Sequence, residues 1–498
     1  MAAIRQGHVY LEVLVAIEIE DKFDVQDEFV VPDLLGVKGI SSASGPKSHQ
    51  LVAIYFDTPD LRLAARGITL RRRRGGDDSG WHLKLPKAAG VRQEIQLPLT
   101  RSAKIVPAAL ADQVLVYTRG HALVPVAELD TKRSVTRLLD GDGEVLAEVA
   151  DDRVKGTVFS QSPDVKPKVE RWREVEVELV KGDEALLKRV GKRIIKAGAV
   201  TGGSANKLGR LLGEAVQKLP QSPAEGTVGA AVFAYLRSQT DALIAQDGRV
   251  RRAEEDAVHK ARVACRRMRS AFKSFSSIVT ETDALQEELK WFGEVLGEVR
   301  DLEVIQLRFG KELDGLDEHL IVGPVRARLL DDLKHQEEEG YERAREAMNG
   351  ERYFALLDAL DQPLSFTGKA TREADEELAK IVAKEWRRVQ KKHETAQAID
   401  DAHEREIAMH DVRKAAKRAR YTAEAAGFGH EAARAEAVQE ALGLYQDGVV
   451  AQETLEKEAA KAREAGEDTF TYGVLAGLER AAADRARAKF PKLWAKLT

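Results

Sequence analysis

The stretch VLVAIEIEDKFDV, residues 13–25, decides how the first part of this chain folds. Apolar residues alternate there with charged ones, as in a β-strand with one buried face and one polar face. Side chains two positions apart share a face, so Glu18, Glu20 and Lys22 point the same way. Two carboxylates beside an ammonium suit a divalent metal together with an anion. A strand with a charged, solvent-facing side explains the same pattern without a ligand, and the rest of the chain decides between the two.

Length, composition and charge limit the class of protein. The 498 residues are too many for one ordinary core, so we expect two or three domains. The net charge of −4 is small, so a preference for anions must come from local clusters of Lys and Arg. A single cysteine, Cys265, excludes an intrachain disulfide and favours a reducing compartment. Without a signal-like N-terminus or a membrane-length apolar run, we expect a cytoplasmic protein with no membrane span.

The composition and the hydrophobic periodicity of the chain change near its middle. Up to about residue 210 it consists mostly of short, β-rich runs separated by Gly, Pro and Asp, with helix-like segments near 104–118 and 183–198. Later residues are rich in Ala, Glu, Arg and Leu at helical spacing. We therefore expect an N-terminal domain over 8–214, a linker over 215–225 and an all-helical domain over 226–498.

Charged residues share faces on most of the predicted strands. These sets are Arg71 with Arg73, His82 with Lys84, Arg92 with Glu94, Arg133 with Arg137, Glu148 with Asp152, and Glu174 with Glu176 and Glu178. Leu and Val occupy the opposite face on several strands. If the apolar faces pack outward against helices, the ionised faces meet inside a closed barrel. Such an interior is stable only when opposite charges, a metal or a ligand neutralise one another. It would suit a polyanion together with a bridging metal.

At this point the residues resemble a known family. The Glu-x-Glu-x-Lys pattern, YFDT at 55–58, LRRR at 70–73, Lys84 and a late Glu-x-Glu pair are similar to the CYTH superfamily, the triphosphate tunnel metalloenzymes. The resemblance covers about residues 10–212. It implies an eight-stranded antiparallel β-barrel tunnel with flanking helices, and hydrolysis of a short phosphate chain with Mg²⁺ or Mn²⁺.

The resemblance also implies roles for individual residues. It assigns catalysis to Glu18, Glu20 and Lys22; metal binding to Glu18, Glu20, Asp152, Glu176 and Glu178; and triphosphate binding to Lys22, Arg71, Arg73, Lys84, Arg92, Arg133 and Lys207. Glu148 and Arg92 are looser matches. His82 has no counterpart, and we interpret it as a polar wall residue rather than a base.

The helical half contains an internal repeat. HKARVACRRMR at 259–269 recurs as HDVRKAAKRAR at 410–420, an offset of 151 residues that also relates Tyr235 and Arg237 to Trp386 and Arg388. LGEVRD at 296–301 recurs as LGLYQD at 442–447, an offset of 146 residues. We therefore predict two homologous helical bundles, over about 226–375 and 376–498.

Each copy of the repeat carries a stripe of cations. On an α-helix, His259, Arg262, Arg266, Arg269 and Lys273 fall within an arc of roughly 80°. His410, Arg413, Lys417 and Arg420 form the same stripe in the second copy. Like charges at this spacing are mildly destabilising, so two stripes in register favour anion binding over a face that is merely solvated.

These motifs resemble the CHAD domain, the conserved histidine α-helical domain, over about residues 226–498. The resemblance implies polyphosphate binding by Arg237, His259, Arg262, Arg266, Arg269, Lys273, Arg388, His410, Arg413, Lys414, Lys417 and Arg420. The second copy departs from the first, because Glu424 stands where Lys273 does and Gln446 where Arg300 does. We expect Asp301 and Asp447 to anchor arginines of the stripes.

We therefore expect an α+β multidomain protein that hydrolyses inorganic triphosphate and binds long-chain polyphosphate, in the cytoplasm and at polyphosphate granules. The tunnel would also hold an organic triphosphate such as thiamine triphosphate or a nucleoside triphosphate, or cyclise ATP. A non-catalytic polyphosphate scaffold is a further alternative, although it would need the carboxylates less than the cations. We do not expect nucleic acid as the partner, because the stripes lack interleaved aromatics for base stacking.

Overall fold

The computed structural model describes residues 2–6, 9–76, 78–88, 91–159, 167–204 and 206–497; the side chains of residues 2–17 and 88 are outside that description. The expected domain limits at residues 8 and 498 also lie outside it. The chain forms two compact units, residues 1–219 and 220–498. No described helix has the length and apolar character needed to cross a membrane.

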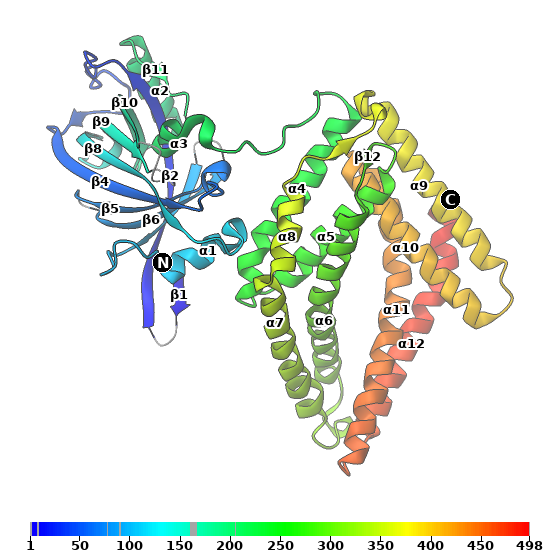
Figure 1. The fold of residues 1–498 in the computed structure, drawn as a ribbon. Coiled ribbons are helices and arrows are strands. Elements are labelled where there is room, and N and C mark those ends of the chain that lie inside the picture. The colour runs from blue at the N-terminus through cyan, green and yellow to red at the C-terminus, as the bar shows by residue number, and fades with distance from the viewer. Residues whose placement is uncertain are drawn as a thin grey trace. The chain divides into compact units, whose positions relative to one another are not determined.

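The first unit is a closed antiparallel β-barrel, as the alternation of charges predicts (Figure 1). Its strands follow one another in the order β2, β10, β9, β8, β4, β5, β6 and β7, and β7 pairs with β2 to close the ring. The strands are β2 (Val9–Val25), β4 (Lys47–Asp57), β5 (Thr69–Arg74), β6 (Gly80–Ala88), β7 (Val91–Leu97), β8 (Val124–Leu139), β9 (Val145–Val158) and β10 (Lys168–Leu179). The short strands β1 (Ala2–Gln6) and β11 (Val200–Thr201) pair with β2, and β3 (Ser42–Ala43) pairs with β8.

Helices cover the apolar outer faces of the barrel strands. The helix α1 (Ala108–Thr118) buries Leu110 and Val114 in a cluster with Leu70, Trp81 and Leu83 of β5 and β6. The helix α2 (Glu184–Lys196) does the same for β9 and β10, where its Leu186, Val190 and Ile194 join Val149, Val175 and Val177. Because the apolar face of these strands packs against helices on the outside of the barrel, their ionised face points into the interior.

A third helix closes one end of the barrel. In α3 (Lys207–Leu212), Leu208, Leu211 and Leu212 lie in one buried cluster with Leu129, Val154 and Trp172, which share strand faces with the ionised interior residues. A Cβ at Gly156 would lie 2.8 Å from Leu211, so this glycine leaves room for the helix. The side chain of Asn206 accepts a hydrogen bond from the Gly209 N–H and begins α3 at Lys207, which is thereby held at the cavity.

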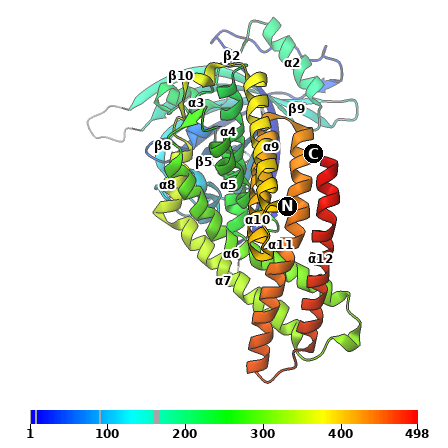
Figure 2. The same cartoon turned by 90° about the vertical axis from the view of Figure 1, so that its right-hand side faces the viewer.

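The second unit is helical and built from two similar halves (Figure 1 and Figure 2). The first half contains α4 (Val228–Arg251), α5 (Ala257–Ser274), α6 (Asp283–Asp314), α7 (Leu333–Asn349) and α8 (Glu351–Leu360); the second contains α9 (Ala374–Gln397), α10 (Ala402–Ala426), α11 (Gly429–Glu464) and α12 (Phe470–Leu497). Short elements connect them: β12 (Val279–Thr280) pairs with β13 (Ser365–Phe366), single turns span Glu318–Leu320 and Gly368–Thr371, and a π-helical segment spans Ala327–Asp332.

The two halves contact each other and repeat the same local packing. Helices α5 and α10, which carry the two stripes, pack together, as do α4 and α9. In each half the stripe's first arginine lies against a glycine of the next helix, Arg262 against Gly297 and Arg413 against Gly443. The matching contacts follow from the LG pair that recurs in the sequence: a Cβ would lie 3.2 Å from the Arg262 guanidinium at Gly297 and 3.4 Å from that of Arg413 at Gly443, so each glycine lets the guanidinium lie close to the helix.

We expect Gly75→Ala to destabilise the barrel more than Gly67→Ala does, although both glycines have left-handed backbone, with φ of +84° and +70°. A Cβ at Gly75 would overlap the carbonyl oxygen of Gln50, whereas nothing lies within 4 Å of one at Gly67. The left-handed conformation costs either variant about 1 kcal/mol, and only Gly75→Ala must also open the pairing of β4 with β5. Calorimetric melting and hydrogen exchange of the β4 amides measure the difference; equal losses would contradict it.

Candidate functional site

The barrel encloses a cavity of about 570 Å³ that is lined from all eight of its closed-ring strands. Glu18, Glu20 and Lys22 of β2 point into it, as the parity of that strand predicts. The other predicted tunnel residues that line it are Arg71, Arg73, Lys84, Arg92, Arg133, Glu148, Glu176, Glu178 and Lys207. The cavity also includes Tyr55 and Glu94, to which the sequence analysis gave no role.

One region of the cavity concentrates carboxylates. Glu20 and Glu178 stand directly opposite each other on β2 and β10, a pairing that is destabilising for like charges unless a cation lies nearby. Burial raises the pKa of Glu178, and Glu20 adds to this effect. Burial and a hydrogen bond with Glu94 raise the pKa of Glu18 to about 7. Two carboxyl groups that share a proton in this way offer hard oxygen donors to a divalent cation.

Cations compensate these carboxylates only in part. Lys84 contacts Glu18. The Nζ of Lys22 lies 3.2 Å from Oε1 of Glu20 and also contacts Glu176. Arg92 contacts the same Glu20 oxygen at 3.2 Å. No ion-pair partner of Glu178 is found in the part of the chain that the structure describes. Glu178 is therefore the carboxylate of this region that the protein leaves without an ion pair in its described part.

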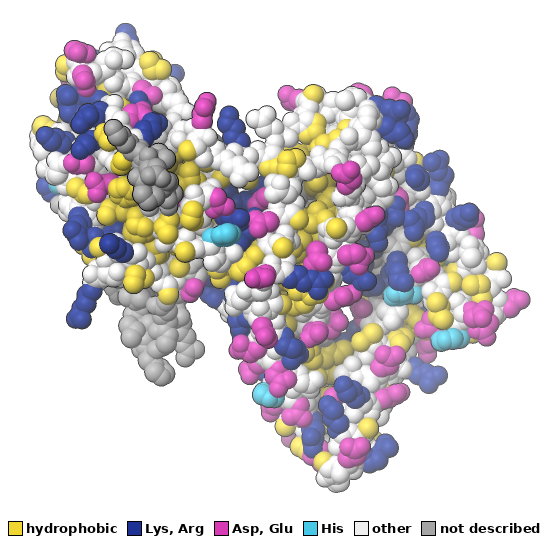
Figure 3. Space-filling model, viewed as in Figure 1, with side chains coloured by type: hydrophobic (Ala, Val, Ile, Leu, Met, Phe, Trp, Pro, Cys, Tyr) yellow, Lys and Arg dark blue, Asp and Glu magenta, His cyan; other side chains and the backbone are white. Residues whose placement is uncertain are grey.

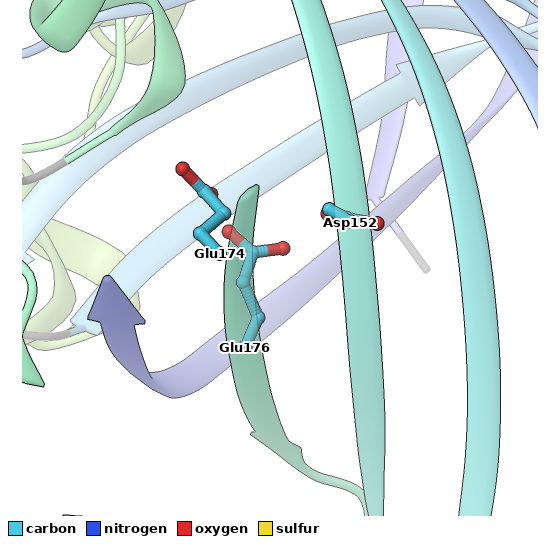
Figure 4. Close-up of side chains that lie close together, drawn as sticks. All are labelled: Asp152, Glu174 and Glu176. Atoms are coloured by element: carbon cyan, nitrogen blue, oxygen red, sulfur yellow. The ribbon is translucent and has the colours of Figure 1, made fainter. Parts of the chain in front are cut away.

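A second carboxylate group is fully balanced. Ligand oxygens of Asp152, Glu174 and Glu176 lie within 4.8 Å of one another between β9 and β10 (Figure 4). The Nζ of Lys207 lies 2.9, 2.6 and 2.8 Å from these three carboxylates, and Arg133 contacts Asp152 through Nε at 2.8 Å and Nη2 at 2.6 Å. Although burial opposes ionisation, Lys207 and Arg133 keep the pKa of Asp152 below its ordinary value. This group has the oxygen donors that a metal needs, but here an ammonium lies among them.

Three guanidinium groups crowd another part of the cavity wall. Burial, together with Arg71 and Arg133, lowers the pKa of Arg73 to about 9. Among the described residues, the Arg71 side chain hydrogen-bonds only with the Tyr55 hydroxyl, which accepts from Nη1 at 3.3 Å. The Nε atoms of Arg71 and Arg73 are buried without a partner there, while Arg73 forms an ion pair with Asp78. Mutually repelling guanidiniums with unused donors have the chemistry that an anion with several oxygens requires.

Two residues behind and beside Glu18 complete this network. Glu94 shares a strand face with Arg92, and that parity correctly predicts that it faces the barrel interior, but only the β2–β7 pairing brings it to Glu18. His82 is buried behind Glu94, with Nδ1 2.8 Å from its Oε1 and Nε2 3.0 Å from the Asp78 carbonyl oxygen. Burial lowers the pKa of His82 to about 4. It does not line the cavity, so it is not part of the cavity wall; it supports Glu94 from behind instead.

The cation stripes of the helical unit meet between its halves. Burial and the nearby Arg413, Arg266 and Arg262 lower the pKa of Lys417 to about 8, so cations of α5 and α10 crowd one another. The Nε atoms of Arg266, Arg269 and Arg413 are buried without a partner among the described residues. Figure 3 shows Lys and Arg side chains gathered over the face formed by α9 and α10. The stripes therefore form one basic surface, not two separate ones.

The structure does not bring every predicted residue to this surface. His259 begins the α5 stripe beside Arg300, and Arg388 of α9 lies near Lys273. Arg237 instead contacts Asp361 at 3.1 Å, on the side of α5 that carries Met268 and Phe272. The spacing shared with Arg388 predicted a common role, but the carboxylate of Asp361 holds Arg237 away from the stripes.

Carboxylates also neutralise some members of the stripes. Arg262 pairs with Asp301 at 3.0 Å, as expected for an anchoring aspartate, whereas Asp447 forms no ion pair with an arginine of the stripes among the described residues. Lys414 lies 3.2 Å from Asp411, and Arg420 lies 2.8 Å from both Glu424 and Glu436. His410 faces Gln446.

The thiol of Cys265, the single cysteine of the chain, is buried, and burial raises its pKa to about 12.

Comparisons with known proteins agree with this architecture. A model of the CYTH domain matches residues 16–210, and a model of the CHAD domain matches residues 234–456. "Uncharacterized protein Rv2226" of Mycobacterium tuberculosis (strain ATCC 25618 / H37Rv) is 38% identical over 503 residues, which cover 97% of this chain and 96% of the relative. "Uncharacterized protein MT2285" of strain CDC 1551 / Oshkosh matches with the same identity and coverage.

Two solved structures resemble parts of the chain. One is described as "PptA from Streptomyces chartreusis", 21% identical, covering 54% of this chain and 99% of that one, with a TM-score of 0.46. Another is the CHAD domain from the plant Ricinus communis, 23% identical, covering 56% of this chain and 94% of that one, with a TM-score of 0.44.

The chain belongs to the family of proteins in which a CYTH domain is followed by a CHAD domain. The CYTH domain places the barrel among folds that act on triphosphates in a tunnel, and the CHAD domain supports polyphosphate binding in general.

We expect Lys417→Met to stabilise the helical unit at pH 7, by an amount that shrinks as the pH rises from about 8 toward 10.5. The pKa of Lys417 is lowered on folding, so in this window the unfolded state binds more protons and the stability of the native protein rises with pH. The Lys417→Met variant has no such group, so its stability does not rise with pH in this way and the native protein approaches it. Calorimetric melting of the full chain across this range measures the difference from the native protein.

The exposed Lys260 on α5 provides the control, because Lys260→Met removes a lysine charge that lies beside Asp256. If both variants differ from the native protein by amounts that do not change with pH, the crowding of Lys417 is not what the structure indicates.

Proposed function

We propose that the barrel hydrolyses inorganic triphosphate to pyrophosphate and phosphate with the help of a divalent metal, and that the helical unit binds inorganic polyphosphate. The observation that carries the first part is one enclosed cavity in which crowded guanidiniums face incompletely balanced carboxylates. A chain of phosphates bound to a divalent cation supplies the opposite charge to both regions at once.

The carboxylates fit a hard divalent cation. Glu18, Glu20 and Glu178 would hold Mg²⁺ or Mn²⁺ through oxygen atoms, with Glu176 at the edge of the group. When bound, the ion would screen phosphate charge and lower the pKa of an attacking water. The group of Asp152, Glu174 and Glu176 fits less well as it stands, because a metal there would have to displace the ammonium of Lys207.

The side chains of the chain itself would bind and polarise the phosphate chain. Arg71 and Arg73 have donors free to contact phosphate oxygens, and Arg133 lies close to both. In the reaction, water attacks a terminal phosphorus in line with the bridging oxygen, that P–O bond breaks, and pyrophosphate leaves. Fixed guanidiniums stabilise this transition state because they already face the oxygens on which charge accumulates.

The cavity wall favours an inorganic over an organic triphosphate. Of the described lining residues only Tyr55 and His49 carry rings, and the Tyr55 hydroxyl is engaged by Arg71. A nucleobase or a thiazolium ring would find little surface on which to stack. Phosphate release from triphosphate, ATP and thiamine triphosphate, each with Mg²⁺ or Mn²⁺, tests this choice directly.

We expect the double variant Glu18→Ala/Glu20→Ala to lose phosphate release by a factor of about a thousand or more, because it removes metal ligands and transition-state stabilisation together. The measurement is phosphate release at saturating metal. Glu128→Gln is the matched control, since Glu128 lies on β8 with the opposite parity to the cavity residues. Metal-dependent turnover that survives in the double variant would exclude this active site.

We expect Arg73→Ala to lower kcat/KM roughly ten- to a hundredfold, because a charge-assisted hydrogen bond contributes about 1.5–3 kcal/mol. Arg74→Ala provides the comparison, as Arg74 is the exposed last residue of the same strand. Steady-state kinetics with triphosphate separate the two variants. Equal effects on kcat/KM would show that the cavity position of Arg73 is irrelevant to binding.

A further inference from the structure

The internal repeat pairs each cation of the first stripe with a residue of the second. At the offset of 151 residues, Arg266 corresponds to Lys417, Arg269 to Arg420 and Lys273 to Glu424. Identical halves would give a basic surface with two equal ends. The exchange of a lysine for a glutamate breaks this symmetry at one end, and the contacts around Glu424 show how far the change extends.

The end that contains Glu424 is closed by carboxylates. Glu424 contacts Arg267 at 2.7 Å through one oxygen and Arg420 at 2.8 Å through the other. Arg420 also contacts Glu436 at 2.8 Å, and these two glutamates raise its pKa despite burial. The guanidiniums of this closed end, Arg267 and Arg420, are therefore occupied by the protein's own anions.

The opposite end is open. It consists of Arg269, Lys273 and Arg388, and within the described part of the chain no carboxylate forms an ion pair with any of them. Burial and then Arg269, Arg418 and Arg388 lower the pKa of Lys273, with Glu287 opposing them from a distance. The neighbouring Arg418 is held by Glu385 at 2.5 Å.

The centre of the surface joins the open end. Arg266 and Lys417 lie together there with Arg413, and no ion pair neutralises these three among the described residues. Like charges gathered in this way repel one another, and an anion that crosses them removes the repulsion. The uncompensated charge thus runs continuously from the centre to the open end and stops at Glu424.

We propose that a phosphate chain binds this surface from one side only, along the centre and the open end of Arg269, Lys273 and Arg388, while Glu424 closes the other end. The proposal rests on the proposed binding of polyphosphate by the helical unit. It makes Glu424 a specificity-determining residue: the carboxylate both occupies Arg420 and repels phosphate where the symmetric lysine would attract it.

The test compares two arginines that the repeat makes equivalent. Binding of long-chain polyphosphate to the full chain is measured by calorimetry over a series of salt concentrations, in the Glu18→Ala/Glu20→Ala background so that the probe is not consumed. Arg269→Ala should weaken binding about tenfold and reduce the salt dependence by about one released counterion. Arg420→Ala should change the affinity less than about twofold, because its charge is already paired.

A gain-of-function variant tests the same idea in the opposite direction. Glu424→Lys restores the cation that the repeat predicts and frees Arg267 and Arg420, so it should tighten binding and steepen the salt dependence. Lys273→Ala serves as a second loss variant should Arg269→Ala melt early. Equal losses in Arg269→Ala and Arg420→Ala, or weaker binding by folded Glu424→Lys, would overturn the one-sided path. Failure of the parent protein to bind polyphosphate at all would overturn the proposed function with it.

Discussion

The structure of the barrel depends on neutralising charges that the protein itself encloses. Buried ions are costly unless paired, and removing one partner leaves the other stranded. Lys207 contacts three carboxylates at once, and Arg133 contacts two of them. These contacts let the barrel close without a ligand. They leave Arg71 and Glu178 without an ion-pair partner among the described residues, and the buried Nε atoms of Arg71 and Arg73 without a hydrogen-bond partner there, so a ligand would be held best between these groups.

The sequence predicted the barrel because a strand fixes the direction of its side chains. Glu18, Glu20 and Lys22 share one face of their strand, so the sequence leaves undecided only which strands pair. Because the opposite faces are apolar and pack outside against helices, the charged side chains point into the barrel. The contacts of Lys207 could not be predicted in the same way. They depend on how α3 packs on Leu129 and Trp172, which are far from it in sequence.

The helical unit shows the limit of arguing from repeats. The repeat correctly paired helices, and the contact of Arg262 with Gly297 recurs as Arg413 with Gly443. It said nothing of partners outside the repeated segments. Asp361 forms an ion pair with Arg237, and Glu436 forms one with Arg420. The repeat equates these arginines with Arg388 and Arg269, which form no ion pair among the described residues. Charge that a motif supplies is available to a ligand only where no neighbouring helix supplies a carboxylate.

Under the proposed function, the two units would bind phosphate in physically different ways. Charges inside the barrel line one enclosed cavity, so salt would screen them weakly and their geometry could select one short chain. The stripes on α5 and α10 are more open, and Lys273 and Arg388 are exposed. Attraction there is screened within about 10 Å at ordinary ionic strength, so binding depends on many weak contacts along a long anion. An enclosed, nearly neutral network favours selective chemistry, whereas an uncompensated surface favours retention of a polymer.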